Sequence, residues 1–137
     1  MADISITPAN VVAGNTATIA RGTAGATITA GQWVFLDSTS GKYNLADTDS
    51  ATAGVRAAVG VALHGASLNQ PLAVCTKGPV TIGGAILAGV AYYLSGTPGA
   101  MCPIADVASG DYPLIVGMGA STTVLNVGVV YPGVVLA

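Results

Sequence analysis

"TAGQWVFLDSTSGKYNLAD", residues 29–47, decides the fold because the chain repeats its pattern as "LAGVAYYLSGTPGAMCPIAD" at residues 87–106. Each version has an Ala-Gly pair, a run of aromatic and apolar residues, a Thr-x-Gly turn and an Ala-Asp end. This order is typical of a strand, a turn and a second strand. The matching glycines lie 58 residues apart, and we predict structural turns at Gly31, Gly41, Gly89 and Gly99.

The amino-acid composition also favours β structure. Only 7% of the 137 residues are charged, 19 are glycine, and the 6 acidic residues are all aspartate. Glu is absent and Lys is rare, which removes common helix formers and leaves Val, Ile, Thr and Tyr. We therefore predict a mainly β fold with little helix: a single-domain jelly-roll or barrel-like β-sandwich with two loosely related halves.

Turn-rich pieces divide the chain into short segments. We expect an N-terminal arm at residues 1–14, a β domain at 15–131 with pseudo-repeats at about 16–75 and 76–131, and a C-terminal tail at 132–137. The helical candidate is 50–57, capped by Asp47 or Asp49. Both ends are suited to adding a strand to a neighbour, or to completing the sheet of this chain. Strands are predicted at residues 17–20, 26–29, 33–36, 43–45, 58–63, 72–75, 80–82, 91–94, 114–117 and 123–130.

The charge pattern argues against membranes and nucleic acid as partners. The mean hydropathy is +0.69, but the uncharged stretches 78–105 and 112–137 are broken by glycines, prolines or polar residues that a lipid-facing helix rarely carries. No signal peptide is visible, so we expect synthesis in a cytoplasm. The cations are too scattered to follow a phosphate backbone.

Catalytic and metal-binding residues are scarce in this sequence. His64 could serve as a base for Ser67, but a hydrogen-bonded turn residue is the better interpretation. Asp47 and Asp49 resemble the start of a calcium loop whose glycine and final Glu are missing, so turn or capping roles are expected. Cys75 and Cys102 are expected to be buried reduced thiols. We predict no catalytic residue, no metal and no cofactor.

Aromatic residues offer one alternative binding function, a platform on which sugars could stack. Most of them fall in the repeated strands and are expected to be core or rim residues. The aromatic candidates are Trp33, Tyr43, Tyr92, Tyr93, Tyr112 and Tyr131.

Four segments in order, "AGQWVFLD", "GKYNLADTD", "VGVAL" and "QPLAV", carry a resemblance to a known family. The series resembles the small decoration, or cement, proteins of tailed bacteriophage heads, over about residues 15–130. The resemblance implies a non-enzymatic structural protein that binds the outer surface of an assembled capsid as a homodimer or homotrimer. Its partner would be the major capsid protein, whose subunits it would cement together on the virion.

Four cations on so neutral a surface are expected to provide specificity against acidic patches of a capsid. The capsid-interface candidates are therefore Arg21, Lys42, Arg56 and Lys77.

Three other functions remain open from the sequence. The chain could be a virion-surface or adhesin-like module that binds a glycan or receptor. It could be a tail or other virion structural protein, or a hydrolase using His64 and a serine.

Overall fold

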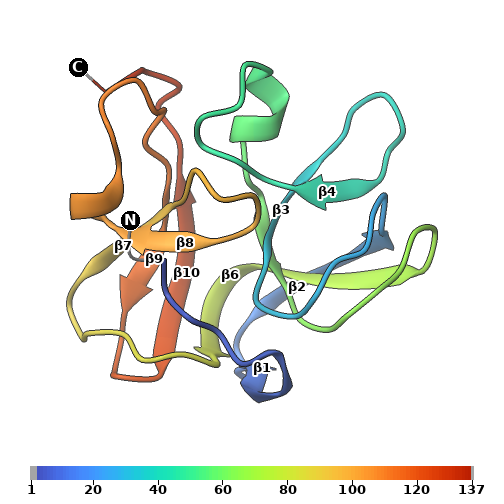
Figure 1. The fold of residues 1–137 in the computed structure, drawn as a ribbon. Coiled ribbons are helices and arrows are strands. Elements are labelled where there is room, and N and C mark those ends of the chain that lie inside the picture. Colours follow the sequence, from blue (N-terminus) through green and yellow to red (C-terminus); the bar gives the residue numbers. More distant parts are fainter. Residues whose placement is uncertain (1–2, 137) are drawn as a thin grey trace.

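The computed structural model describes residues 3–136. Its longest strand, β6 (Pro71–Ile82), pairs with other strands along both of its edges. β2 and β5 both pair with Cys75, and β2 and β10 both pair with Lys77. β5 and β10 therefore lie on the edge of β6 opposite β2. In Figure 1, β6 runs between β2, β3 and β4 on one side and β7 to β10 on the other. Met1, Ala2 and Ala137, which belong to the predicted arm and tail, lie outside the described residues.

The strands form one strongly curled antiparallel sheet, a half-barrel, in the order β4-β3-β5-β6-β10-β9-β7-β8. β1 and β2 pair with β6 outside this path, and β1 lies within the residues predicted as an arm. The prediction of a mainly β, barrel-like single domain is confirmed. The remaining strands are β1 (Val11–Ala13), β2 (Thr18–Thr23), β3 (Trp33–Leu36), β4 (Tyr43–Leu45), β5 (Gly60–Ala62), β7 (Ala91–Leu94), β8 (Met101–Pro103), β9 (Ile115–Gly119) and β10 (Val124–Val130).

The two halves of the sheet repeat one pairing pattern. Val34 on β3 faces Leu45 on β4, and Tyr92 on β7 faces Pro103 on β8, so the two hairpins share a register. On the other side Val34 faces Gly60 and Tyr92 faces Gly117. β3, β4 and β5 of the first half thus correspond to β7, β8 and β9 of the second half. β10 corresponds to the first part of β6.

β6 combines the strands predicted at 72–75 and 80–82. The intervening Lys77-Gly78-Pro79 favours a break by sequence, but β2 and β10 pair across it. The register with β2 shifts between Thr18 and Ile19, and Gly78 has a φ of +103°, so a local bulge keeps the strand continuous. The strand can therefore pair on both sides along most of its length.

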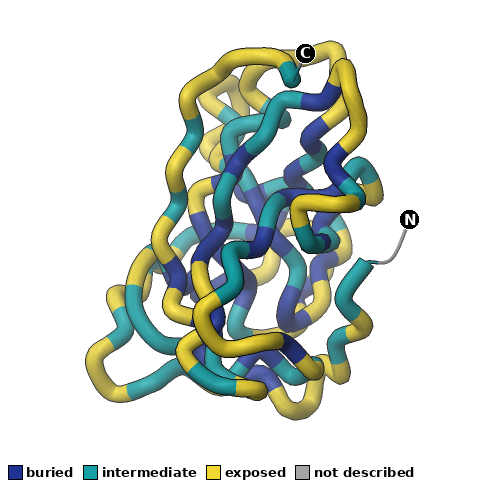
Figure 2. Tube along the Cα trace, turned by 90° about the vertical axis from the view of Figure 1, so that its left-hand side faces the viewer, coloured by how far each residue is buried: buried dark blue, intermediate teal, exposed yellow. Residues whose placement is uncertain are grey.

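The hydrophobic core has two parts, on opposite faces of the first half. Trp33, Val61 and Cys75 pack with residues of the second half inside the curl. Their neighbours Val34 and Val74 point the other way into a second cluster, with residues of 24–30 and 62–72. Figure 2 shows buried segments along the interior and exposed residues along the loops at both ends.

Several local predictions are wrong or are refined. Residues 26–29 form no strand and make one isolated bridge, between Ile28 and Ala66. The helical candidate 50–57 is a single 3-10 turn, η2 (Ala53–Arg56), with no side-chain cap. Within residues 3–136, no helix is long and apolar enough to cross a bilayer. The other 3-10 turns are η1 (Pro8–Asn10) and η3 (Ile104–Asp106).

The glycines predicted at turns all have positive φ values, which L side chains rarely adopt. The values are +89° at Gly31, +71° at Gly41, +76° at Gly89 and +79° at Gly99.

Substituting two glycines of one sheet tests the close strand approach. A Cβ at Gly117 would lie 2.4 Å from Asn126 O, whereas a Cβ at Gly128 would meet nothing within 4 Å. Gly117→Ala should lower the free energy of unfolding by about 2 kcal/mol or more, because backbone must move. Gly128→Ala should leave it unchanged or raise it by under about 1 kcal/mol. Urea denaturation measures both, and equal effects would contradict the observed strand spacing.

Candidate functional site

His64 has both ring nitrogens committed to the backbone. Its Nδ1 lies 2.9 Å from Gly65 O, and its Nε2 accepts the Ala73 N–H at 3.0 Å. The predicted role as a hydrogen-bonded turn residue is confirmed. Since Nδ1 must carry the proton that faces the carbonyl, Nε2 is the only basic nitrogen and it is occupied. The backbone N–H of Ser67 donates to Gln70 Oε1 rather than to His64.

Asp47 and Asp49 form a turn at the junction between the two halves. Asp47 Oδ1 accepts the Asp49 N–H at 3.1 Å, which is the predicted turn role. Next to it, Thr48 is fully buried. Its N–H donates to Ser95 O and its C=O accepts the Tyr112 N–H, and both partners belong to the second half. Among residues 3–136, no three His, Cys or Asp side chains gather closely enough to hold a metal ion. Burial raises the pKa of Asp47 to about 6, with Asp49 and the charge of Asp111 adding to the effect.

The raised pKa of Asp47 makes the stability depend on pH. Between pH 3.8 and about 6 the folded protein keeps a proton on Asp47 that the unfolded chain has lost. Stabilisation present below pH 3.8 should therefore be lost as the pH rises through about 6. Asp47→Asn should flatten this fall and should raise stability at pH 7, as read from denaturation curves across the range. Asp106→Asn serves as the control, and the same fall in Asp47→Asn would contradict the assignment.

The two cysteines are buried free thiols, as predicted. Burial raises the pKa of Cys75, and burial with the charges of Asp3, Asp106 and Asp111 raises the pKa of Cys102 to about 12. Because the thiolate is the nucleophilic form, both side chains are unreactive in the folded protein.

The aromatic side chains do not form an exposed platform. Trp33 is 0% exposed, Tyr92 3% and Tyr43 6%, so these three belong to the core. Tyr93, Tyr112 and Tyr131 are half-buried. The prediction that most of these aromatics are core or rim residues is confirmed.

The four cations proposed for a capsid interface lie on separate elements. Arg21 is exposed on β2, and Lys77 is exposed in the middle of β6. Lys42 is half-buried, and its Nζ donates to Asn69 Oδ1 at 2.6 Å. Within the described part of the chain none of the four pairs with an aspartate.

Arg56 differs from the other cations because its contacts are internal. Its guanidinium stacks 3.5 Å from the centre of the Tyr112 ring, and Nε donates to Tyr131 Oη at 3.4 Å. Nη1 donates to Ser50 O at 3.0 Å, so one side chain joins both halves. Neither tyrosine is near Arg56 in sequence, which is why sequence reasoning missed this contact.

Removing Arg56 should therefore destabilise the fold. Arg56→Ala should lower the free energy of unfolding by about 1–2 kcal/mol, because a half-buried cation–π contact and two hydrogen bonds are lost. Lys77→Ala, on an exposed side chain, should change it by less than about 0.5 kcal/mol. Thermal and urea denaturation measure both variants. If the two variants proved equally stable, Arg56 would be a surface cation rather than a link between the halves.

Both ends of the described chain make backbone hydrogen bonds within the fold. The Ile4 N–H donates to Met101 O at 2.9 Å on the outer edge of β8, and the Thr7 N–H donates to Gly83 O at 2.8 Å. At the other end, Leu136 exchanges hydrogen bonds with Gly110 and Asp111. The alternative in which the ends complete this chain's own structure is therefore the one observed.

The outer edge of β2 is open at Ile19 and Arg21, whereas its end at Thr23 lies beside β4, where Ala24 forms a parallel bridge with Tyr43. The N–H of Gly25 covers the edge of β4 by donating to Tyr43 O, and Ile4 covers the edge of β8. On β6, the Ala73 N–H and C=O both point toward the β5 side, to His64 and Leu63. Because hydrogen-bonding direction alternates along a strand, the residue opposite Ala73 on β2 turns its backbone groups away from β6.

The residue opposite Ala73 is Arg21. By the same alternation, Ile19 and Thr23 also direct their N–H and C=O groups outward. The Thr23 C=O takes part in the parallel bridge to Tyr43 of β4, whereas no described residue accepts from or donates to the outward groups of Ile19 and Arg21. Ile19 is 41% exposed and Arg21 is exposed. β2 therefore presents a row of unpaired backbone groups with one apolar and one positive side chain beside it.

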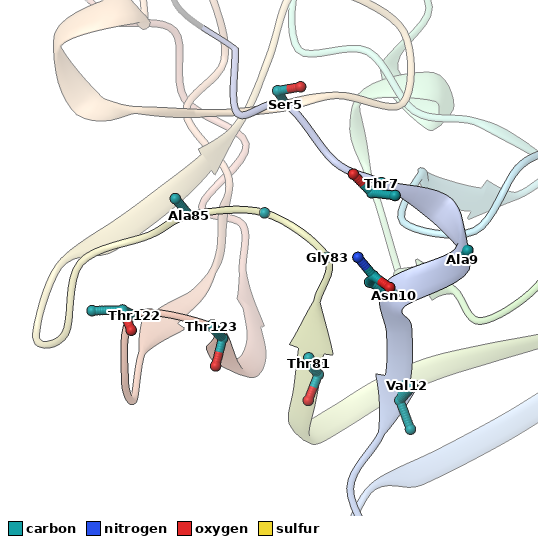
Figure 3. A pocket seen from close by; sticks show the side chains of 11 residues that line it. Ser5, Thr7, Ala9, Asn10, Val12, Thr81, Gly83, Ala85, Thr122 and Thr123 are labelled. Carbon is teal, nitrogen blue, oxygen red and sulfur yellow. The ribbon is translucent and has the colours of Figure 1, made fainter.

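An open hollow of about 810 Å³ lies beside β1, at the end of β6 (Figure 3). Ser5 and Thr7 of the N-terminal segment lie on one side of it and Thr122 and Thr123 on the other, and Thr81 on β6 also lines it. Its lining holds hydroxyls, the Asn10 amide and apolar atoms, with no charged or aromatic side chain. The hollow can hydrogen-bond a neutral polar group, but it has no acid, base or nucleophile with a raised reactivity.

Large apolar side chains are exposed on many elements of the described chain. They are Val12, Ile19, Leu36, Val59, Leu68, Leu87, Ile104, Met118, Val130, Val134 and Val135.

Comparison with known protein families and with curated proteins finds no match to this chain.

Proposed function

We propose that this chain is a structural virion protein that binds the outer surface of an assembled phage capsid and cements major capsid subunits together, without enzymatic activity. The observation that carries the proposal is its surface: exposed large apolar side chains on a chain in which 7% of residues are charged. Such a surface suits permanent contact with protein better than free solution. The similarity of "AGQWVFLD", "GKYNLADTD", "VGVAL" and "QPLAV" to cement proteins supports the same function.

The open edge of β2 gives this function a mechanism. An extended capsid segment added to β2 would exchange backbone hydrogen bonds with Ile19 and Arg21. In an antiparallel arrangement, a carboxylate opposite Arg21 and an apolar residue two positions further along the segment would match the side chains of β2. Arg21 thereby becomes the leading interface cation of the four, whereas Arg56 acts within the fold.

Binding acts on the capsid by mass action. A protein that binds only the assembled lattice stabilises it against disassembly, and the stabilisation grows with the concentration of free protein. Many copies on one shell would make individually modest contacts effective together.

A proline on β2 tests this function and its mechanism. The Arg21 N–H has no partner within the described chain, so Arg21→Pro should keep the fold while removing an outward donor. On capsids assembled without this protein, from the major capsid protein of the same genome, wild type should saturate a regular set of sites. Arg21→Pro should bind about tenfold or more weakly, as the loss of one or two hydrogen bonds implies. Arg21→Ala should lose less affinity but most of its salt dependence.

Ser38→Pro is the matched control, since Ser38 is an exposed turn residue away from β2 and should bind like wild type. Circular dichroism and melting temperatures check that each variant is folded. Absence of wild-type binding would contradict the function itself. Equal binding of Arg21→Pro and wild type would contradict only the role of β2.

A further inference from the structure

The hydroxyl-lined hollow beside β1 gathers polar side chains that the fold does not use. Elsewhere in the fold hydroxyls have partners: Thr48 Oγ1 donates to Tyr112 O, and Ser121 Oγ accepts the Val124 N–H. In the hollow, by contrast, no polar side chain of the lining hydrogen-bonds to another described residue. These side chains are Ser5, Thr7, Asn10, Thr81, Thr122 and Thr123. Their donors and acceptors are therefore available to a ligand.

Backbone hydrogen bonds fix the two sides of the hollow relative to each other. The segment 82–86 lies between them (Figure 3). On one side the Thr7 N–H donates to Gly83 O at 2.8 Å, and on the other the Ile86 N–H donates to Thr122 O at 3.0 Å. A Cβ on Gly83 would lie 2.6 Å from Thr7 O, so glycine lets the N-terminal segment approach this closely. The hollow is thus formed before any ligand arrives, which lowers the cost of binding.

The lining of the hollow selects for a neutral and polar ligand. It contains no charged side chain, so a phosphate or a metal ion would find no opposite charge. It contains no aromatic ring on which a nucleobase could stack. A wholly apolar ligand would cover the hydroxyls without hydrogen-bonding them, which costs binding free energy.

Among neutral polar ligands, a saccharide matches the lining best. A Ser or Thr hydroxyl both donates and accepts a hydrogen bond, as a sugar hydroxyl does. Ala9, Val12 and Ala85 lie among the polar groups, and Val12 is 59% exposed, so the C–H groups of a sugar ring would have apolar contacts. An extended peptide would instead require free backbone groups, but Thr7 N–H and Gly83 O already pair with each other. The volume of about 810 Å³ is within the range of ligand sites.

We propose that the hydroxyl-lined hollow binds a short neutral oligosaccharide, whose hydroxyls pair with side chains of residues 5–7 on one side and 122–123 on the other. The site does not depend on the proposed function, because its lining includes no residue of β2. If the chain does decorate a capsid, which rests on the proposed function, many weak sites on one shell would together bind a polysaccharide surface.

Neutral trisaccharides test the site in free solution, with no capsid present. Maltotriose, cellotriose and triacetylchitotriose are titrated into ¹⁵N-labelled protein while amide shifts are followed by NMR. At least one should shift the Thr7, Gly83 and Thr122 amides with a Kd of about 1 mM, which a few neutral hydrogen bonds can supply. The double variant Thr7→Val, Thr122→Val should bind that sugar about tenfold or more weakly, because it lacks two hydroxyls at nearly unchanged shape.

Thr39→Val is the matched control, because Thr39 is exposed, lies outside the hollow and has a hydroxyl with no partner in residues 3–136. It should bind like wild type, and melting curves should show both variants folded. Absence of shifts with all three trisaccharides would overturn the proposal, as would undiminished binding by the double variant. Equal or tighter binding of trigalacturonate, or of a neutral Gly-Ser peptide, would overturn it too. Capsid binding is measured separately, so failure of the sugar site is distinguishable from failure of the proposed function.

Discussion

The double-sided pairing of β6 is the constraint on which the rest of the structure depends. Its 12 residues hydrogen-bond to β2 and β1 along one edge and to β5 and β10 along the other. A slip of one residue would move Val74 into the cluster around Trp33 and Cys75 into the second cluster, because neighbouring side chains point to opposite faces. The bulge near Thr18 and the positive φ of Gly78 let β6 serve both halves without such a slip. The register of each half is thereby set by the same strand.

This arrangement explains which surfaces are buried and which are open. Stacking the first half on the second buries Trp33, Val61 and Cys75, and no third repeat follows to bury the equivalent Ala91, Met118 and Asn126. Likewise β1 covers the edge of β6 in the second half, while the equivalent edge of β2 stays open at Ile19 and Arg21. A chain of two repeats therefore ends with one open edge and one open face. The edge carries Arg21 and suits a strand with a carboxylate, whereas the face is nearly uncharged.

Much of the fold could be predicted from sequence because it follows from local patterns. The apolar runs around Trp33 and Tyr92 and the turn glycines are enough to indicate two related hairpins. Longer-range features were inaccessible to such patterns. β8 contains Pro103 and is only three residues long, and residues 26–29 have strand-like composition but cover the second core cluster instead.

The candidate site was predicted only in part, for the same reason. Scarcity of charge singled out four cations, but Arg56 contacts Tyr112 and Tyr131, which lie more than 50 positions away. The two halves also differ in which face of the sheet is covered, and a sequence without its topology does not reveal that.

Hydrogen exchange on decorated capsids tests the central claim most directly, namely that partners bind where the repeat scaffold leaves backbone or apolar surface open. In free protein the Ile19 and Arg21 amides should exchange rapidly, because they have no partner within the described chain. On capsids, segments covering Thr18–Thr23 should become protected, while segments around the hydroxyl-lined hollow should exchange as before. Protection confined to the hollow, or unchanged exchange along β2 in protein bound to capsids, would contradict the account.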